Sequence, residues 1–218
     1  MTYQKADGFG RLARPYQFLE RVFLGRALDE LRFCFLERAE VQAAQTVLIL
    51  GEGDGRFLKA ALEQMPKASF QVVDFSPGML EVAEARLSQE ERLRVSFTCR
   101  DARDYDFVGS QYDGLVMHCF LDCFSEQTLQ DVLPRWLGLV RAGGWVWIGD
   151  FVEPRMIGWR WLRLRALYRF FRVITGIEAK RVADPLEILC SSGFALLGDR
   201  STARGACRSR VFQRIPED

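Results

Sequence analysis

Residues 47–62 read VLILGEGDGRFLKAAL, and this stretch decides the fold. Four apolar residues lead into glycines at alternate positions (Gly51, Gly53 and Gly55), and a segment with helical spacing follows. Glycine adopts positive φ and lets the backbone approach a ligand without a Cβ in the way. The amino terminus of the helix behind the turn favours a negatively charged group. The stretch therefore predicts a strand, a ligand-binding turn and a helix, although a glycine-rich turn can also be purely structural.

The rest of the chain predicts an alternation of strands and helices around this unit. Apolar runs predict strands over 46–50, 69–74, 93–98, 112–118 and 144–151. Helical spacing predicts helices over 55–66, 77–88, 125–141 and 181–192, the second of them capped by Ser76 with Pro77 at its first position. The tail predicts a terminal antiparallel pair of strands. The fold class is therefore α/β, a doubly wound, mostly parallel seven-stranded sheet.

The length of 218 residues favours a single domain, 1–218, in four parts. A helical cap with a possible break at Gly25 covers residues 1–45, and the core covers 46–151. An inserted helical lid follows over 152–180, and the last helix with the terminal strands covers 181–218.

Composition excludes several classes of protein. Lysine plus arginine (30) and aspartate plus glutamate (29) nearly cancel, whereas nucleic-acid-binding domains show a strong basic excess, so no nucleic-acid partner is expected. The six cysteines form no C-x-x-C pair, and the first residues lack an apolar signal region, which predicts reduced thiols and a cytoplasmic protein. No apolar run reaches the roughly 18 residues that a membrane span needs.

The acidic residue Asp74 indicates which class of ligand the glycine turn binds. It ends the second predicted strand, 23 positions after Gly51, near the offset at which a carboxylate binds ribose hydroxyls. Asp74 could also be an ordinary solvated turn residue, but turn and carboxylate together favour a bound nucleoside. Arg56 stands where a dinucleotide fingerprint needs glycine, so a dehydrogenase is the least favoured class.

With these motifs in place, the chain resembles the class I S-adenosylmethionine-dependent methyltransferases, in particular those acting on quinones and small molecules. LGEGDG, VVDFSPGML, CRDARDYDF, YDGLVMHCFLDCF and LVRAGGWVWIGDF resemble the family's motifs in the family's order, over residues 46–151. The resemblance implies a Rossmann-like fold, S-adenosylmethionine as methyl donor, and Asp74 on its ribose. Other implied donor-binding residues are Gly51, Glu52, Gly53, Gly55, Phe75, Met79, Asp101, Ala102 and His118.

One position departs from the family pattern. The family carries an acid two positions before the first glycine, and here that position is Ile49. Glu52 inside the turn is the candidate to take over the contact with the donor's ammonium group. The departure also keeps open a non-catalytic, nucleoside-binding regulatory or partner protein.

The segment HCFLDCF, residues 118–124, is expected to face the methyl acceptor. His118, the chain's only histidine, and Asp122 are the candidate catalytic residues, since either side chain could act as a base toward a hydroxyl or phenol. The alternatives are a hydrogen-bonded core histidine and a helix-capping aspartate. No second cluster supports a metal site with Cys123, so none is expected.

Residues 155–176, RMIGWRWLRLRALYRFFRVITG, combine six arginines with five aromatic residues. At helical spacing they form two apolar stripes on nearly opposite sides, whereas a membrane-surface helix has one apolar face. We expect a lid over the donor that selects a small, apolar or aromatic acceptor. Transient membrane contact, a partner surface and a solvated cover helix remain alternatives, and oligomeric state stays open.

Overall fold

The computed structural model of the protein describes residues 25–107, 109, 111–152, 185–202, 205 and 207–216. The first 24 residues of the expected helical cap and the whole of 155–176 lie outside these ranges. The stripes, the lid and the membrane contact expected for 155–176 therefore stay predictions.

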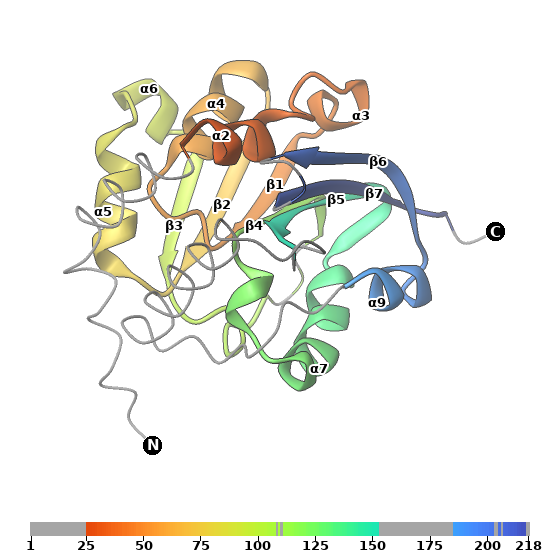
Figure 1. Ribbon diagram of the computed structural model, residues 1–218. Coiled ribbons are helices and arrows are strands. Elements are labelled where there is room, and N and C mark those ends of the chain that lie inside the picture. The colour runs from red at the N-terminus through yellow and green to blue at the C-terminus, as the bar shows by residue number, and fades with distance from the viewer. Residues whose placement is uncertain are drawn as a thin grey trace, which may run out of the picture.

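A seven-stranded sheet forms the centre of the molecule (Figure 1). Its strands follow the order β3-β2-β1-β4-β5-β7-β6, with the first five parallel and β7 antiparallel to both of its neighbours. The strands are β1 (Thr46–Leu50), β2 (Ser69–Asp74), β3 (Val95–Cys99), β4 (Tyr112–His118), β5 (Val140–Phe151), β6 (Phe194–Thr202) and β7 (Cys207–Arg214). The chain adds β2 and β3 on one side of β1 and then β4 and β5 on the other, so the strand order reverses between β1 and β4, and this confirms the predicted doubly wound α/β fold.

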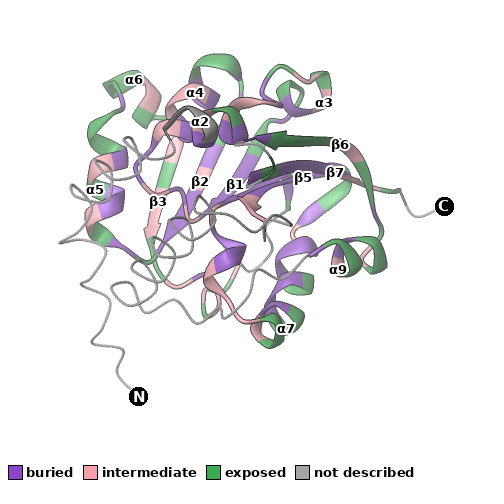
Figure 2. Ribbon diagram, viewed as in Figure 1, coloured by how far each residue is buried: buried purple, intermediate pink, exposed green. Residues whose placement is uncertain are grey.

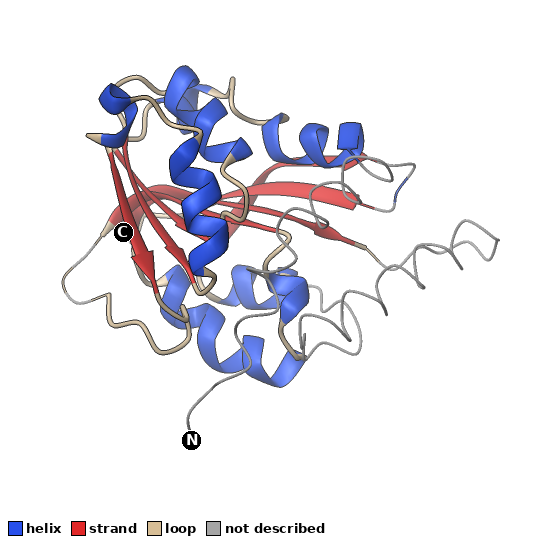
Figure 3. Ribbon diagram, turned by 90° about the vertical axis from the view of Figure 1, so that its left-hand side faces the viewer, coloured by secondary structure: helices blue, strands red, loops and turns tan. Residues whose placement is uncertain are grey.

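Helices cover both faces of the sheet (Figure 3). One face carries α2 (Gly25–Phe33), α3 (Ala39–Gln42), α4 (Arg56–Gln64), α5 (Pro77–Ala85) and α6 (Gln89–Arg92). The other carries the short 3-10 helix η1 (Leu121–Cys123), α7 (Glu126–Leu137) and α9 (Leu186–Ser191). At the start of α5 the amide of Met79 donates to Ser76 Oγ, so the predicted serine cap with proline behind it is confirmed.

Several predicted boundaries are wrong by a few residues. The helix predicted to reach 141 ends at Leu137, because the chain after Gly138 extends and Val140 pairs with Tyr112 as the first residue of β5. The helix predicted over 77–88 ends at Ala85, and Ser88 instead caps the separate α6 through a capping box with Glu91. Strand β3 begins at Val95 instead of residue 93, and α4 ends at Gln64 instead of 66.

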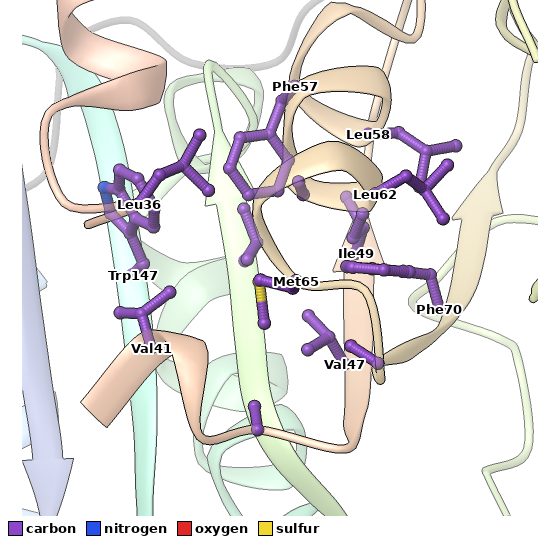
Figure 4. Packing of buried hydrophobic residues seen from close by; sticks show 14 of the residues in the cluster. Leu36, Val41, Val47, Ile49, Phe57, Leu58, Leu62, Met65, Phe70 and Trp147 are labelled. Carbon is purple, nitrogen blue, oxygen red and sulfur yellow. The ribbon is translucent and has the colours of Figure 1, made fainter. Parts of the chain in front are cut away.

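The sheet separates two apolar cores, and β1 contributes to both. Val47 and Ile49 face the core under α4, whereas Leu48 and Leu50 face the core under α7. In Figure 4, Leu62 of α4 lies beside Ile49, and Phe57 of the same helix lies on the side of Trp147. The central strands are buried along their length (Figure 2), so the end of β1 is held from both sides before the glycine turn begins.

The edge strand β6 differs from the central strands. Its register with β7 shifts between Leu196 and Gly198, and Leu196 is half exposed. Beyond the shift, Asp199 of β6 forms an ion pair with Arg208 of β7. The edge is therefore bulged and charged.

Asp113 ties the amino ends of β1 and β4 together. Its Oδ2 accepts from the amides of Gln45 (2.7 Å) and Thr46 (2.8 Å), and Arg141 Nε donates to its Oδ1. Burial opposes ionisation, but these donors outweigh it and hold the pKa of Asp113 below its usual value. The carboxylate therefore stabilises the edge of the sheet that lies opposite the glycine turn.

Asp113→Ala is expected to lower the free energy of unfolding by about 1.5–3 kcal/mol, because two amides lose a charged acceptor. Since the folded pKa is depressed, this stabilisation is present above the unfolded pKa and is lost as the pH falls through the folded one. Denaturant titration at pH 7 and at pH 3 measures both effects. Asp106→Ala, at an exposed acid, is the control, and an equal loss at both pH values would contradict the ionic role.

Candidate active site

The predicted site residues gather at one edge of the sheet. They follow the carboxyl ends of β1, β2, β3 and β4, and these ends share an edge because the strands are parallel. At this edge the strand order reverses between β1 and β4, and ligands bind at that point in sheets of this type.

The three glycines of the turn all have positive φ, at 70°, 71° and 83°. A Cβ on Gly51 would lie 2.3 Å from the ring of Phe120, and one on Gly55 would lie 2.6 Å from Cα of Ala83 in α5. A Cβ on Gly53 would have nothing within 4 Å. Gly51 and Gly55 are therefore needed for packing, whereas Gly53 exposes its backbone to open space, as a ligand cradle requires.

Asp74 lies beside this open position. Its Oδ2 accepts from the amide of Gly53 (3.2 Å) and its Oδ1 from the amide of Ser76 (2.9 Å). Burial raises the pKa of the Asp74 carboxyl to about 6, against the lowering effect of these amides. The carboxylate is thus buried, ionised at neutral pH and held against the turn, which a solvated turn residue would not be.

Glu52 points back into the protein. Its Oε1 accepts from the amide of Leu58 (2.9 Å), which lies in the first turn of α4. Burial raises the pKa of Glu52 to about 8, and the nearby Arg32 partly opposes the shift. Ile49 is fully packed in the core under α4. Glu52 therefore caps α4, and its contact with a donor ammonium stays a prediction.

The remaining predicted donor-binding residues differ in exposure. Phe75, directly after Asp74, is 41% exposed, whereas Met79 is 3% exposed in the first turn of α5. Ala102 is buried, and its carbonyl accepts from Trp136 Nε1 (3.1 Å). Arg103 pairs with Asp101 and outweighs the effect of burial, so the pKa of Asp101 lies below its usual value. The structure brings all four to the predicted edge, and their contacts with a donor stay predictions.

His118 ends β4 in a tight aromatic environment. Its ring packs edge-on against Phe57 and Trp147, with centroids 4.8 Å and 4.9 Å away, and only 7% of the residue is exposed. Neither ring nitrogen has a hydrogen-bond partner among the described residues. Burial, and then the charge of Arg32, lowers its pKa well below the usual value. His118 is therefore a neutral wall residue at physiological pH.

The segment after β4 places Asp122 on the face of the sheet that carries α7, opposite to the face on which His118 packs against Phe57. Cys119 adopts a positive φ of 51°, and its amide donates to the carbonyl of Gly149 (2.7 Å). The chain then turns into η1, where Asp122 is buried and Cys123 Sγ lies 3.7 Å from Asp122 Oδ1. Asp122 therefore does not cap α7, whose cap is Ser125.

Asp150, in β5, is a candidate that the sequence did not reveal. Both carboxylate oxygens are buried, and neither has a hydrogen-bond partner among the described residues. Burial, together with the charge of Asp122, raises the pKa of Asp150 well above its usual value. The sequence shows an acid inside a strand otherwise rich in tryptophan, WVWIGDF, which is the signal that could have found it.

The described residues contain neither a metal-binding cluster nor a membrane-spanning helix. No three His, Cys, Asp or Glu side chains gather there as a metal site would need. No helix within the described ranges is long and apolar enough to cross a bilayer.

Comparisons with known proteins agree with this geometry. Residues 47–144 match the family model described as a methyltransferase domain. Over 108 residues the chain is 28% identical to a malonyl-[acyl-carrier protein] O-methyltransferase of Anoxybacillus flavithermus, a match that covers 46% of this chain and 40% of that protein.

Solved structures show the same fold. An O-methyltransferase family protein from Burkholderia thailandensis superposes with a TM-score of 0.75 at 21% identity, covering 100% of this chain and 65% of that one. An O-methyltransferase from neocarzinostatin biosynthesis, solved with S-adenosylmethionine and 2-hydroxy-5-methyl naphthoic acid, gives 0.64 at 17% identity, with 95% and 60% covered.

Residues 47–144 are thus a methyltransferase domain. The seven-stranded sheet has the fold of the solved O-methyltransferases, as expected from the resemblance of the sequence to the class I, S-adenosylmethionine-dependent methyltransferases. The chain spans less than half the length of the curated relative and less than two thirds of each of the two solved chains, 65% and 60%.

Proposed function

We propose that the protein binds S-adenosylmethionine at the glycine turn and transfers its methyl group to a small, apolar or aromatic acceptor. The observation that carries the proposal is the pair formed by Gly53, with open space where a Cβ would stand, and the buried Asp74 carboxylate bonded to its amide. A nucleoside donor needs close backbone approach and an anionic acceptor for ribose hydroxyls. The residues present therefore fit this donor.

Arg56 supports this donor over a dinucleotide. Its Nε contacts Asp54 Oδ2 (3.0 Å) and its NH1 contacts Asp29 Oδ1 (3.1 Å). The side chain thus fills the position where a dinucleotide fold has glycine and the pyrophosphate approaches the helix. A dehydrogenase remains the least favoured activity.

The acceptor is inferred from the residues beyond β4. Phe120, Phe124 and Trp136 contact one another, with ring centroids 5.0–5.8 Å apart, next to the glycine turn. Such a cluster suits an apolar or aromatic molecule. The relatives named above are O-methyltransferases, which favours oxygen as the methylated atom. We do not assign the carrier-protein substrate of the curated relative to this protein, because the match covers less than half of this chain.

In this proposal the site residues orient the donor, exclude water and line the acceptor position. The turn and Asp74 orient the donor, whose sulfonium supplies an activated methyl group. The aromatic cluster excludes water, which strengthens electrostatic interactions inside the site. Asp122 faces the acceptor, whereas His118, held between Phe57 and Trp147, forms the wall behind it. Donor binding without turnover on any acceptor would favour the regulatory alternative.

Calorimetric titration with S-adenosylmethionine and, separately, NADH tests the proposal. The wild type is expected to bind only the former, and Asp74→Ala is expected to weaken binding by about 1.5–3 kcal/mol, or roughly 10- to 150-fold. Asp113→Asn is the matched control, because it alters a buried acid at the opposite edge of the sheet. Its dissociation constant should equal that of the wild type. Absence of binding in a folded wild type would contradict the proposal.

A further inference from the structure

Asp54, the fourth residue of the glycine turn, binds two arginines that come from different helices. Its Oδ2 contacts Arg56 Nε at the start of α4 (3.0 Å) and Arg86 Nη2 directly after α5 (2.9 Å). Arg86 Nε also donates to the main-chain carbonyl of Asp54. Arg56 in turn contacts Asp29 of α2 (3.1 Å). The side chain of Asp54 is only 6% exposed, so this carboxylate joins the turn to its surroundings from inside the protein.

Gly55 allows α5 to come close enough for the contact between Arg86 and the turn. A Cβ on Gly55 would lie 2.6 Å from Cα of Ala83, so the backbone of α5 packs directly on the turn. Arg86 has helical φ and ψ and follows Ala83 by three residues, and residues three apart lie on the same side of a helix. The close approach at Ala83 therefore places Arg86 beside Asp54.

The turn is held at two main-chain groups. Asp74 accepts from the amide of Gly53, and Arg86 donates to the carbonyl of Asp54. These two groups flank the peptide that joins Gly53 to Asp54, next to the open position at Gly53. Gly53 and Gly55 have positive φ, a conformation that glycine permits but does not enforce. The turn therefore depends on contacts from outside to keep one conformation, and Arg86 supplies one from the α5 side.

We propose that Arg86 and Asp54 are positioning residues that hold the glycine turn in the conformation that binds the donor. The inference rests on the proposed function. Groups in a binding site must stay within about 0.5 Å of the productive geometry, and the residues behind them provide this precision. Because the ion pair orders the turn before the donor arrives, the donor does not have to order it on binding. The pair thus raises donor affinity through the backbone, without a contact of its own to the donor.

Calorimetric titration with S-adenosylmethionine measures the effect on affinity. Arg86→Ala should raise the dissociation constant about 3- to 10-fold, since both bonds from the arginine to Asp54 are lost. Arg86→Lys should lie between this variant and wild type, because an ammonium group replaces one of the two bonds. Arg92→Ala is the matched control. Arg92 also donates to a carboxylate and to a main-chain carbonyl, but both belong to Glu84 of α5 instead of the turn. Its dissociation constant should equal that of wild type.

Hydrogen exchange of the donor-free protein separates a loosened turn from a loss of overall stability. In Arg86→Ala the amides of residues 51–55 should exchange faster, whereas those of β1, residues 46–50, should keep the wild-type rate. A general structural role for Arg86 would not produce this difference. Faster exchange in both segments would therefore overturn the positioning role.

The outcomes separate this inference from the donor assignment. Wild-type affinity in Arg86→Ala would overturn the positioning role, as would equal weakening by Arg86→Ala and Arg92→Ala, since the effect would then come from α5 as a whole. Absence of binding in a folded wild type would instead contradict the donor assignment. If Arg86→Ala does not fold, judged by thermal unfolding, Arg86→Lys decides, and wild-type affinity in that variant would overturn the inference.

Discussion

Gly55→Ala is expected to destabilise the protein by roughly 3 kcal/mol or more, whereas Gly53→Ala should cost only about 1–2 kcal/mol and yet weaken donor binding. Both positions have positive φ, which is strained for alanine. At Gly55 the added Cβ also meets the backbone of Ala83, which cannot move without shifting α5. At Gly53 it meets open space, which we assign to the donor, and overpacking there should cost a further 1–3 kcal/mol of binding, about 5- to 150-fold.

Thermal unfolding and titration with S-adenosylmethionine, run on both variants, measure the two effects. The variants are matched, because each changes one hydrogen to a methyl group in the same turn at nearly the same φ. A Gly53→Ala protein that binds the donor as tightly as wild type would show that the open space is not the donor site. Equal stability of the two variants would contradict the packing role of Gly55.

Glu52→Gln is expected to make the protein more stable than wild type in alkaline solution. The folded pKa of about 8 lies above the ordinary value of 4.5, so the folded state holds a proton that the unfolded state has lost. The contribution of Glu52 is complete below pH 4.5 and declines as the pH rises toward 8. At about 1.4 kcal/mol per pKa unit the loss approaches roughly 5 kcal/mol. Glutamine keeps the oxygen that accepts from Leu58 and has no proton to lose.

Denaturant titrations of wild type and variant at pH 5 and pH 9 measure this difference. The variant should match wild type at the lower pH and exceed it at the higher. Glu63→Gln, on the same helix but with its side chain 60% exposed, is the control and should follow wild type at both. A difference between wild type and Glu52→Gln that does not grow with pH would contradict a buried, protonated Glu52.

The sequence predicted the strands better than the helix ends. The strands 46–50, 69–74 and 112–118 have the predicted bounds, because each is an apolar run that stops at a glycine or a polar residue. The end of α7 was missed because Leu139 and Val140 continue its apolar spacing. Only the pairing of Val140 with Tyr112, 28 positions earlier, makes that segment a strand.

Within the site, the sequence predicted residues that belong to a local motif, but not residues whose surroundings come from distant parts of the chain. Asp74 follows its strand at a characteristic distance from the glycine turn, and the structure places its carboxylate on Gly53. Asp150 has no such motif. Its burial depends on η1, nearly 30 positions earlier, and on β7, about 60 positions later. Glu52 was expected to face the donor, because the sequence does not show that its side chain turns back to the amide of Leu58.

The edge strand β6 has a consequence for self-association. An exposed edge strand is a template on which another molecule can add a strand and start aggregation. In β6 the register shift after Leu196 bends the edge, and the Asp199–Arg208 ion pair places charge along it. Both features oppose flat strand addition. The sheet therefore ends at β6, and the half-exposed Leu196 is flanked by features that discourage growth of the sheet into a fibril.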